Sequence, residues 1–223
     1  MKHLPALAAA LLLAVGAQAQ SPLTDSTGTY VQPIFGYSVV GSQGSAAIGG
    51  VALGTRVSDN VDLGFRLFGG DNSFSGTSLV VGGGPTLGVS GSLGRFDAYA
   101  NLAGTAVFGE TLSADASSGL QSLGLQSSAT LGYPLDLGRS VRLAPTLGAY
   151  ANVCTSFVEG SPGGQCAELG ALAGVDLAFR ALGAEVSVPL LVPISIMGST
   201  KGAAPGAFGL QSLPATSGLR IRF

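Results

Sequence analysis

Apolar and polar residues alternate with a period of two along most of the chain beyond residue 30. In the segment 168–180, for example, apolar residues take the odd positions, while Glu168, Asp176 and Arg180 stand at even ones. Because side chains of an extended strand point alternately to its two sides, this period predicts strands with one apolar face. Ten segments are predicted as strands, over about residues 31–39, 51–57, 61–67, 78–89, 96–108, 123–136, 141–152, 168–180, 184–195 and 208–223.

The connections between these segments alternate in length. Short turns fall near residues 58–60, 92–95, 138–140 and 181–183, and longer polar loops fall near 41–46, 70–76, 110–119, 154–165 and 196–206. Short turns join consecutive strands into antiparallel hairpins. The predicted fold is therefore all-β, an antiparallel up-and-down β-barrel of about ten strands. A count of eight stays open if two of the short candidates are not strands.

The composition indicates that the apolar face of this barrel points outward. The 223-residue chain has 36 Gly and only 10% charged residues, with a mean hydropathy of +0.48. Such a composition fits either an unusually apolar soluble β protein or strands whose apolar faces contact lipid. The second face carries mostly Gly, Ser, Thr and Ala, which suits a narrow lumen and would make a poor water-exposed surface. We expect a transmembrane β-barrel, with a secreted soluble β-barrel that binds a ligand as the alternative.

Both ends of the chain carry recognisable features. Residues 1–19 begin with basic Lys2, continue through an apolar run and end on Ala17-Gln18-Ala19, as in a cleaved secretory signal. The last segment, 218–223, alternates apolar residues with arginines and ends on Phe223.

Signal peptide, alternating strands and terminal Phe223 resemble those of small bacterial outer-membrane β-barrel proteins. The resemblance implies export, insertion among the lipids of the bacterial cell outer membrane, and recognition of Phe223 by the barrel-assembly machinery. It also implies periplasmic short turns and extracellular long loops. The expected organisation is a signal peptide over 1–19, a short N-terminal segment over 20–27 and a single barrel domain over 28–223.

Charged residues of the polar face are predicted to form an ionic network in the lumen near the short-turn rim. The members are Arg56, Asp62, Arg66, Asp97, Asp136, Arg142, Asp176, Arg180, Glu185, Arg220 and Arg222. Acidic and basic members are nearly equal in number, and an unpaired charge in a low-dielectric lumen is costly. The alternative is a solvated rim in which the charges are not coupled.

The chain has two cysteines, Cys154 and Cys166, on either side of a polar segment that contains Gly and Pro. Since the signal peptide directs them to an oxidising compartment, we predict a disulfide that closes this extracellular loop. Loop closure of this kind contributes about 3 kcal/mol. Metal binding by the two thiols is the alternative, but it lacks a histidine partner.

The sequence offers no catalytic machinery. Its single histidine, His3, lies in the signal peptide, which excludes Ser-His-acid and Cys-His chemistry in the mature chain. The carboxylates of the polar face each lie close to an arginine, so structural ion pairs explain them better than catalysis. We expect no enzyme, no cofactor and no metal site. A net charge of −2 with scattered basic residues gives no sign of nucleic-acid binding.

The expected role is therefore that of a structural protein or a narrow pore. Surface binding or adhesion through the extracellular loops is an alternative from a different class, and the oligomeric state stays open.

Overall fold

The computed structural model describes residues 28–39, 45–72, 77–111, 118–138, 140–157, 164–181, 184–201 and 220–222. The strands are β1 (Thr29–Val39), β2 (Ser45–Ser58), β3 (Val61–Asn72), β4 (Thr77–Leu93), β5 (Phe96–Thr111), β6 (Ser118–Gly132), β7 (Leu135–Asp136), β8 (Val141–Ser156), β9 (Gly164–Ala181), β10 (Ala184–Lys201) and β11 (Arg220–Arg222). In this part of the chain, no helix is long and apolar enough to cross a membrane.

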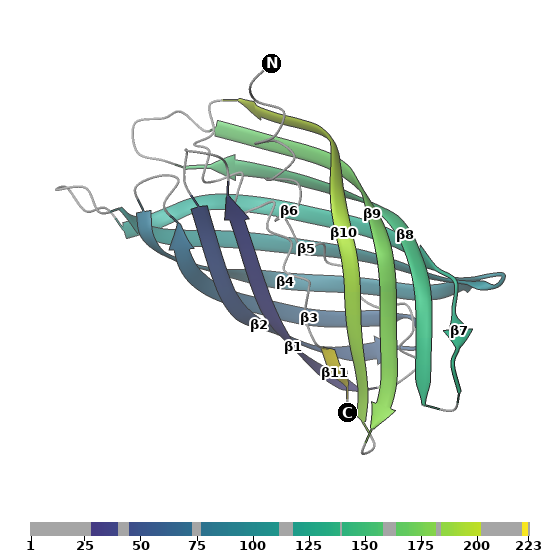
Figure 1. The fold of residues 1–223 in the computed structure, drawn as a ribbon. Helices are drawn as coiled ribbons and strands as arrows, with labels where there is room; N and C mark the ends of the chain where they lie inside the picture. Colours follow the sequence, from purple (N-terminus) through teal and green to yellow (C-terminus); the bar gives the residue numbers. More distant parts are fainter. Residues whose placement is uncertain are drawn as a thin grey trace.

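Nine long strands form one curled antiparallel sheet, in the order β1 to β6 followed by β8 to β10 (Figure 1). The short β11 pairs with β1 on one side and with β10 on the other, so the two edges of the sheet are joined. Short β7 follows β6 and pairs with β8, as β6 does, so the two together count as one strand of the wall. The described strands thus form an all-β, antiparallel, up-and-down barrel of ten strands, as predicted.

The strands are longer than the alternation predicted. The strand expected from about residue 51 begins at Ser45 in β2, and the one expected to end near residue 195 continues to Lys201 in β10. Part of each predicted long loop is therefore strand. The reason is that ladder hydrogen bonds use the backbone, so pairing continues through Gly, Ser and Thr where the side-chain pattern fades.

Other predicted segments are described in part or not at all. The turn Asp59–Asn60 joins β2 to β3, and Gly94–Arg95 joins β4 to β5 with Gly94 at a φ of +66°. Of the last predicted strand, only Arg220–Arg222 is described, and Phe223 and residues 202–219 lie outside the described residues. The predicted signal peptide (1–19) and N-terminal segment (20–27) also lie outside them.

Glycines on the inner face let aromatic rings lie flat against the wall. The ring of Tyr30, 1% exposed, lies directly over Gly54 of β2, where an added Cβ would collide with it. A Cβ on Gly64 of β3 would lie 2.7 Å from the Tyr30 hydroxyl. Phe68 covers Gly82 in the same manner, with ring atoms 2.6–2.7 Å from the position of an added Cβ. On this side of the barrel, large rings thus pack over residues without side chains.

Candidate functional site: the two faces of the barrel wall

The inner face of the barrel is polar through much of its length. Its buried polar residues are Gln32, Asp62, Arg66, Thr86, Asn101, Thr105, Ser122, Gln126, Thr130, Thr146, Asn152, Asp176 and Ser187. They alternate along the strands with residues that point outward, as the period of two requires. The residues removed from water in this fold are thus to a large extent those that a soluble protein places outside.

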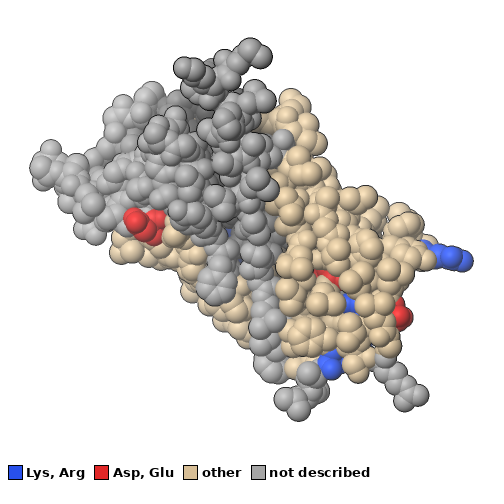
Figure 2. Space-filling view, viewed as in Figure 1, with Lys and Arg blue, Asp and Glu red and all other residues tan. Residues whose placement is uncertain are grey.

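The outer face is apolar. The exposed large apolar residues are Leu53, Val57, Leu63, Phe65, Leu67, Leu79, Val81, Leu87, Val89, Leu93, Phe96, Leu102, Phe108, Leu123, Leu125, Leu131, Tyr133, Leu135, Leu137, Val141, Leu147, Val153, Phe157, Leu169, Leu190, Val192, Ile194, Ile196 and Met197. Figure 2 shows few charged side chains on the described part of the visible face. Apolar patches above a few hundred Å² mark contact with a membrane or a partner, and here the apolar residues come from nearly every long strand.

Three layers follow one another inside the β2–β5 side of the barrel. Near the short Asp59–Asn60 turn, the Nε of Arg56 lies 3.1 Å from the Oδ1 of Asp62, and both side chains are buried, with 6% and 2% exposed. Arg66 lies four residues further along β3. Beyond it, near the strand ends that lead into the long connections, Ile48, Phe68, Val80 and Val107 form a buried apolar cluster.

Arg66 is the largest of the fully buried side chains, at 2% exposure. Its Nη1 donates a hydrogen bond to the Oε1 of Gln126 on β6 at 2.7 Å. Its Nη2 donates to the Oγ1 of Thr105 on β5. The side chain can reach past β4 because the residue opposite Arg66 there is Gly84. Neither Gln126 nor Thr105 stood out in the sequence, since their role depends on what lies across the lumen.

The predicted ionic network is distributed over several places. Arg56 and Asp62 come together inside the barrel as expected. Asp136 and Arg142 also pair, with the Nε of Arg142 2.9 Å from the Oδ1 of Asp136, but these side chains are 69% and 29% exposed. This pair lies at the solvated rim because β7 is a two-residue strand next to the turn. Arg66 differs from the expectation as well, since its described partners are neutral.

The remaining members lie on β5, β9, β10 and β11. Asp97 is half-buried at the start of β5, Asp176 is fully buried on β9, and Arg180 is exposed near the end of β9. The backbone of Glu185 on β10 lies opposite both Arg180 and Arg222. The side chains of Glu185, Arg220 and Arg222 lie outside the described residues. A wider network stays a prediction.

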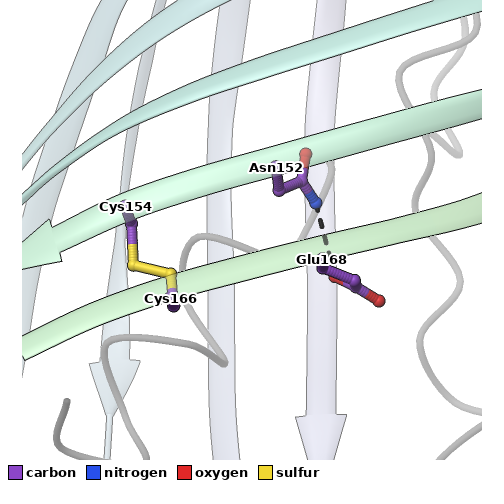
Figure 3. The surroundings of a disulfide bond; sticks show 4 residues. All are labelled: Asn152, Cys154, Cys166 and Glu168. Carbon is purple, nitrogen blue, oxygen red and sulfur yellow. Dashed lines mark hydrogen bonds between the residues drawn. A yellow bond between two sulfur atoms is a disulfide. The ribbon is translucent and has the colours of Figure 1, made fainter. Parts of the chain in front are cut away.

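Cys154 and Cys166 form a disulfide, as predicted (Figure 3). They are directly opposite each other in the β8–β9 ladder, with Cα atoms 4.9 Å apart. Both are buried on the inner face, at 6% and 5% exposure. The bond therefore links two paired strands inside the barrel and does not lie in a loop, because β8 and β9 extend two residues beyond it.

A small polar cluster lies beside this disulfide. The hydroxyl of Tyr150 donates to the Oε1 of Glu168 at 2.7 Å. The Nδ2 of Asn152 donates to the Oε2 of Glu168 at 3.4 Å (Figure 3). Both carboxylate oxygens of Glu168 thus accept hydrogen bonds from the neighbouring strand. The described residues contain no group of three or more His, Cys, Asp or Glu side chains that could hold a metal ion.

The outer wall has a groove of about 570 Å³ over β3 to β6. It is lined by Gly82–Gly84 together with Phe65, Leu67 and Phe108, among other residues. The described pairing of β4 with β5 skips Gly84 and Pro85, and Pro85 has no N–H to offer to the ladder. The groove is lined mainly by apolar side chains and suits an apolar chain rather than a polar ligand.

Comparisons with known proteins give no further information about the site. No protein-family model and no curated protein sequence matches this chain.

Proposed function

We propose that this chain is an integral outer-membrane β-barrel protein whose lumen is filled by its own side chains. Its role in this proposal is structural: it forms a stable, lipid-embedded barrel that carries long loops on one side. Lipids are its main partners, and the barrel-assembly machinery inserts it by reading Phe223. No catalysis is proposed, because the sequence has no histidine beyond His3.

The observation that carries this proposal is the reversed distribution of polar and apolar residues across the wall. Arg66 and Asp62 are each 2% exposed, whereas Phe65 and Leu67 on the same strand are 49% and 53% exposed. In water this arrangement would hydrate the apolar face and bury the polar one, and both effects are unfavourable. In a bilayer the apolar face contacts hydrocarbon, and the closed ladder satisfies the backbone hydrogen bonds.

The packing of the interior favours a filled lumen over an open pore. Arg66, Tyr30, Leu172, Val80 and Val107 are each less than 2% exposed or at that limit, and they come from five different strands. Barrels of about eight strands are just wide enough for side chains to fill them. Large inward side chains such as Tyr30 and Arg66 would also fill the wider lumen of a ten-strand barrel.

The outer groove fits the same proposal. An apolar depression beside Phe65 and Phe108 would be filled by lipid acyl chains in a membrane, while in water it would stay hydrated at a cost. Surface binding through the long loops stays a prediction, since the residues of those loops lie largely outside the described ones.

Cell fractionation combined with gel mobility tests the proposal. We expect the protein in the outer-membrane fraction, soluble only with detergent, and with a mobility in SDS that changes on boiling because a closed barrel resists SDS until heated. Recovery in the periplasm or medium without detergent would overturn the membrane assignment. Purified protein in planar bilayers should show no steady conductance above background, and a reproducible conductance would replace the filled lumen by a pore.

A further inference from the structure

We propose that Arg66 and Glu168, on opposite walls of the lumen, form one charge pair bridged by the two amides of Gln126 and Asn152. These four side chains, called the strap below, extend from β3 through β6 and β8 to β9. The strap deepens the proposed filled lumen, because it is a specific device that holds the two walls together. It rests on contacts inside the barrel and does not require the membrane assignment.

The β3 end of the strap is the guanidinium of Arg66, whose side chain is 2% exposed. Its Nη1 donates to the Oε1 of Gln126 at 2.7 Å, and its Nη2 donates to the Oγ1 of Thr105. Both acceptors are neutral and do not by themselves offset the cost of burying a cation. Asp62, on the same strand, already contacts Arg56. Because the guanidinium is closed to solvent, we expect its counter-charge to come from another side chain.

The β9 end of the strap is the carboxylate of Glu168, which is half-buried. Its two oxygens accept hydrogen bonds from the Tyr150 hydroxyl and the Asn152 amide. Both donors are neutral, so they hold the carboxylate in place without cancelling its charge. The Cys154–Cys166 disulfide lies two residues away along both strands and fixes the ladder at this point (Figure 3). Glu168 is thus a fixed negative charge on the inner wall.

The middle of the strap consists of two buried amides on neighbouring strands. Gln126 on β6 lies directly opposite Asn152 on β8, and their side chains are 6% and 4% exposed. Opposite residues in an antiparallel pair have Cβ atoms about 4.5–5.5 Å apart, so their side chains are neighbours. Gln126 presents its carbonyl oxygen to the cation, and Asn152 presents its amino group to the anion. Both amide dipoles are therefore oriented favourably between the two charges.

The spacing of the strands sets the expected strength of this charge pair. Gln126 and Glu168 are two strands apart, which is about 10 Å at about 4.8 Å per strand. The guanidinium of Arg66 contacts Gln126, so the two charges are separated by a similar distance. Opposite unit charges about 10 Å apart, at an effective dielectric constant of about 20, change an equilibrium constant on the order of tenfold.

A double-mutant cycle measures whether the two charges interact. Wild type, Arg66→Gln, Glu168→Gln and the variant with both changes are compared by denaturant titration in lipid vesicles. Each single change leaves the other charge uncompensated, whereas the double change removes both. We therefore expect the product of the two single fold increases in the unfolding equilibrium constant to exceed the increase in the double variant by about tenfold.

The matched control is the cycle of Glu168→Gln with Arg56→Gln. Arg56 is the other arginine buried in the lumen and has its own carboxylate partner, Asp62. Its cycle with Glu168 should be additive within about twofold. An Arg66 cycle that is additive within about twofold, or an Arg56 cycle with the same coupling as the Arg66 cycle, would overturn the strap.

A carboxylate placed at the other end of the strap gives a second, independent test. Gln126→Glu supplies a negative charge at the position that Arg66 already contacts. In this background, Glu168→Gln should raise the unfolding equilibrium constant by about twofold or less, compared with about tenfold in the wild-type background. An undiminished effect would show that Glu168 does not compensate Arg66. If the protein is recovered without detergent, the same variants are titrated in buffer, so the strap and the membrane assignment can fail separately.

Discussion

The inner and outer faces of β3 differ sharply in polarity and exposure, although their residues alternate along a single strand. Phe65 and Leu67 on the outer face are 49% and 53% exposed, while Arg66 between them is 2% exposed. A step of one residue thus separates an exposed apolar surface from a buried cation. The alternation alone is compatible with either orientation, because a soluble barrel has the same period with its apolar face inside.

The comparison teaches that the two faces are stabilised by different interactions. On the inner face, charges and rings are held by specific partners, such as Asp62 for Arg56 and Gly54 for Tyr30. On the outer face, the proposed membrane assignment requires only apolar surroundings and no specific partner for each side chain. Substitutions should therefore be judged by the chemistry of a partner inside the barrel and by polarity alone outside it.

Loss of the buried carboxylate should have the largest effect. Asp62→Asn leaves the buried Arg56 facing a neutral amide, and breaking a buried pair in this way costs about 3–5 kcal/mol. We expect a drop of that size in the free energy of unfolding, measured by denaturant titration of the protein in lipid vesicles. The double variant Asp62→Asn with Arg56→Gln removes both charges and should recover part of the loss. If the double variant is less stable than the single one, the pair is not the reason for the effect.

A charge introduced on the outer face should have the next largest effect on stability. Whether this charge destabilises the protein tests the membrane assignment. Leu67→Arg places a cation near the middle of β3 on the apolar face, which costs about 2–4 kcal/mol at the bilayer midplane. The same vesicle titration measures this, and Leu67→Ile serves as a control that should change little. If Leu67→Arg is neutral or improves solubility without detergent, the outer face contacts water.

Adding a methyl group to a glycine should also have different effects on stability at an inner-face position and at an exposed position. A Cβ at Gly170 on the inner face would collide with the Tyr150 ring and lie 2.6 Å from the carbonyl oxygen of Ile194. Because the Tyr150 hydroxyl is held by Glu168, the ring cannot move away freely. Gly170→Ala should cost about 1–3 kcal/mol by overpacking.

Gly91 provides the matched control for this substitution. It is an exposed strand glycine with no atom within 4 Å of an added Cβ, so Gly91→Ala should be neutral or slightly stabilising in the same titration. Equal effects at Gly91 and Gly170 would mean that the inner wall is loosely packed.

Local patterns explain which parts of this structure could be predicted from the sequence. Alternation predicted the strands and short turns, and the Arg56–Asp62 contact spans six residues across one such turn. The partners of Arg66 are 39 and 60 residues away and could not be predicted. They depend on the register of four strands and on Gly84, which leaves space for the arginine to pass. The placement of the disulfide within the ladder likewise required knowing how far β8 and β9 extend.

The smallest effect is expected at the solvated rim, where an ion pair of the same two residue types as Arg56–Asp62 lies in water. Asp136 and Arg142 are 2.9 Å apart, a separation similar to that of the buried pair, but the Asp136 side chain is 69% exposed. Solvent and salt screen such a pair, so Asp136→Asn should cost only about 0–1 kcal/mol. Its effect should vanish at high salt, whereas that of Asp62→Asn should persist because burial excludes the screening ions. Comparing the two variants in low and high salt measures how far the barrel interior is shielded from solvent and ions. If the effect of Asp62→Asn falls at high salt as much as that of Asp136→Asn, water and ions reach Asp62.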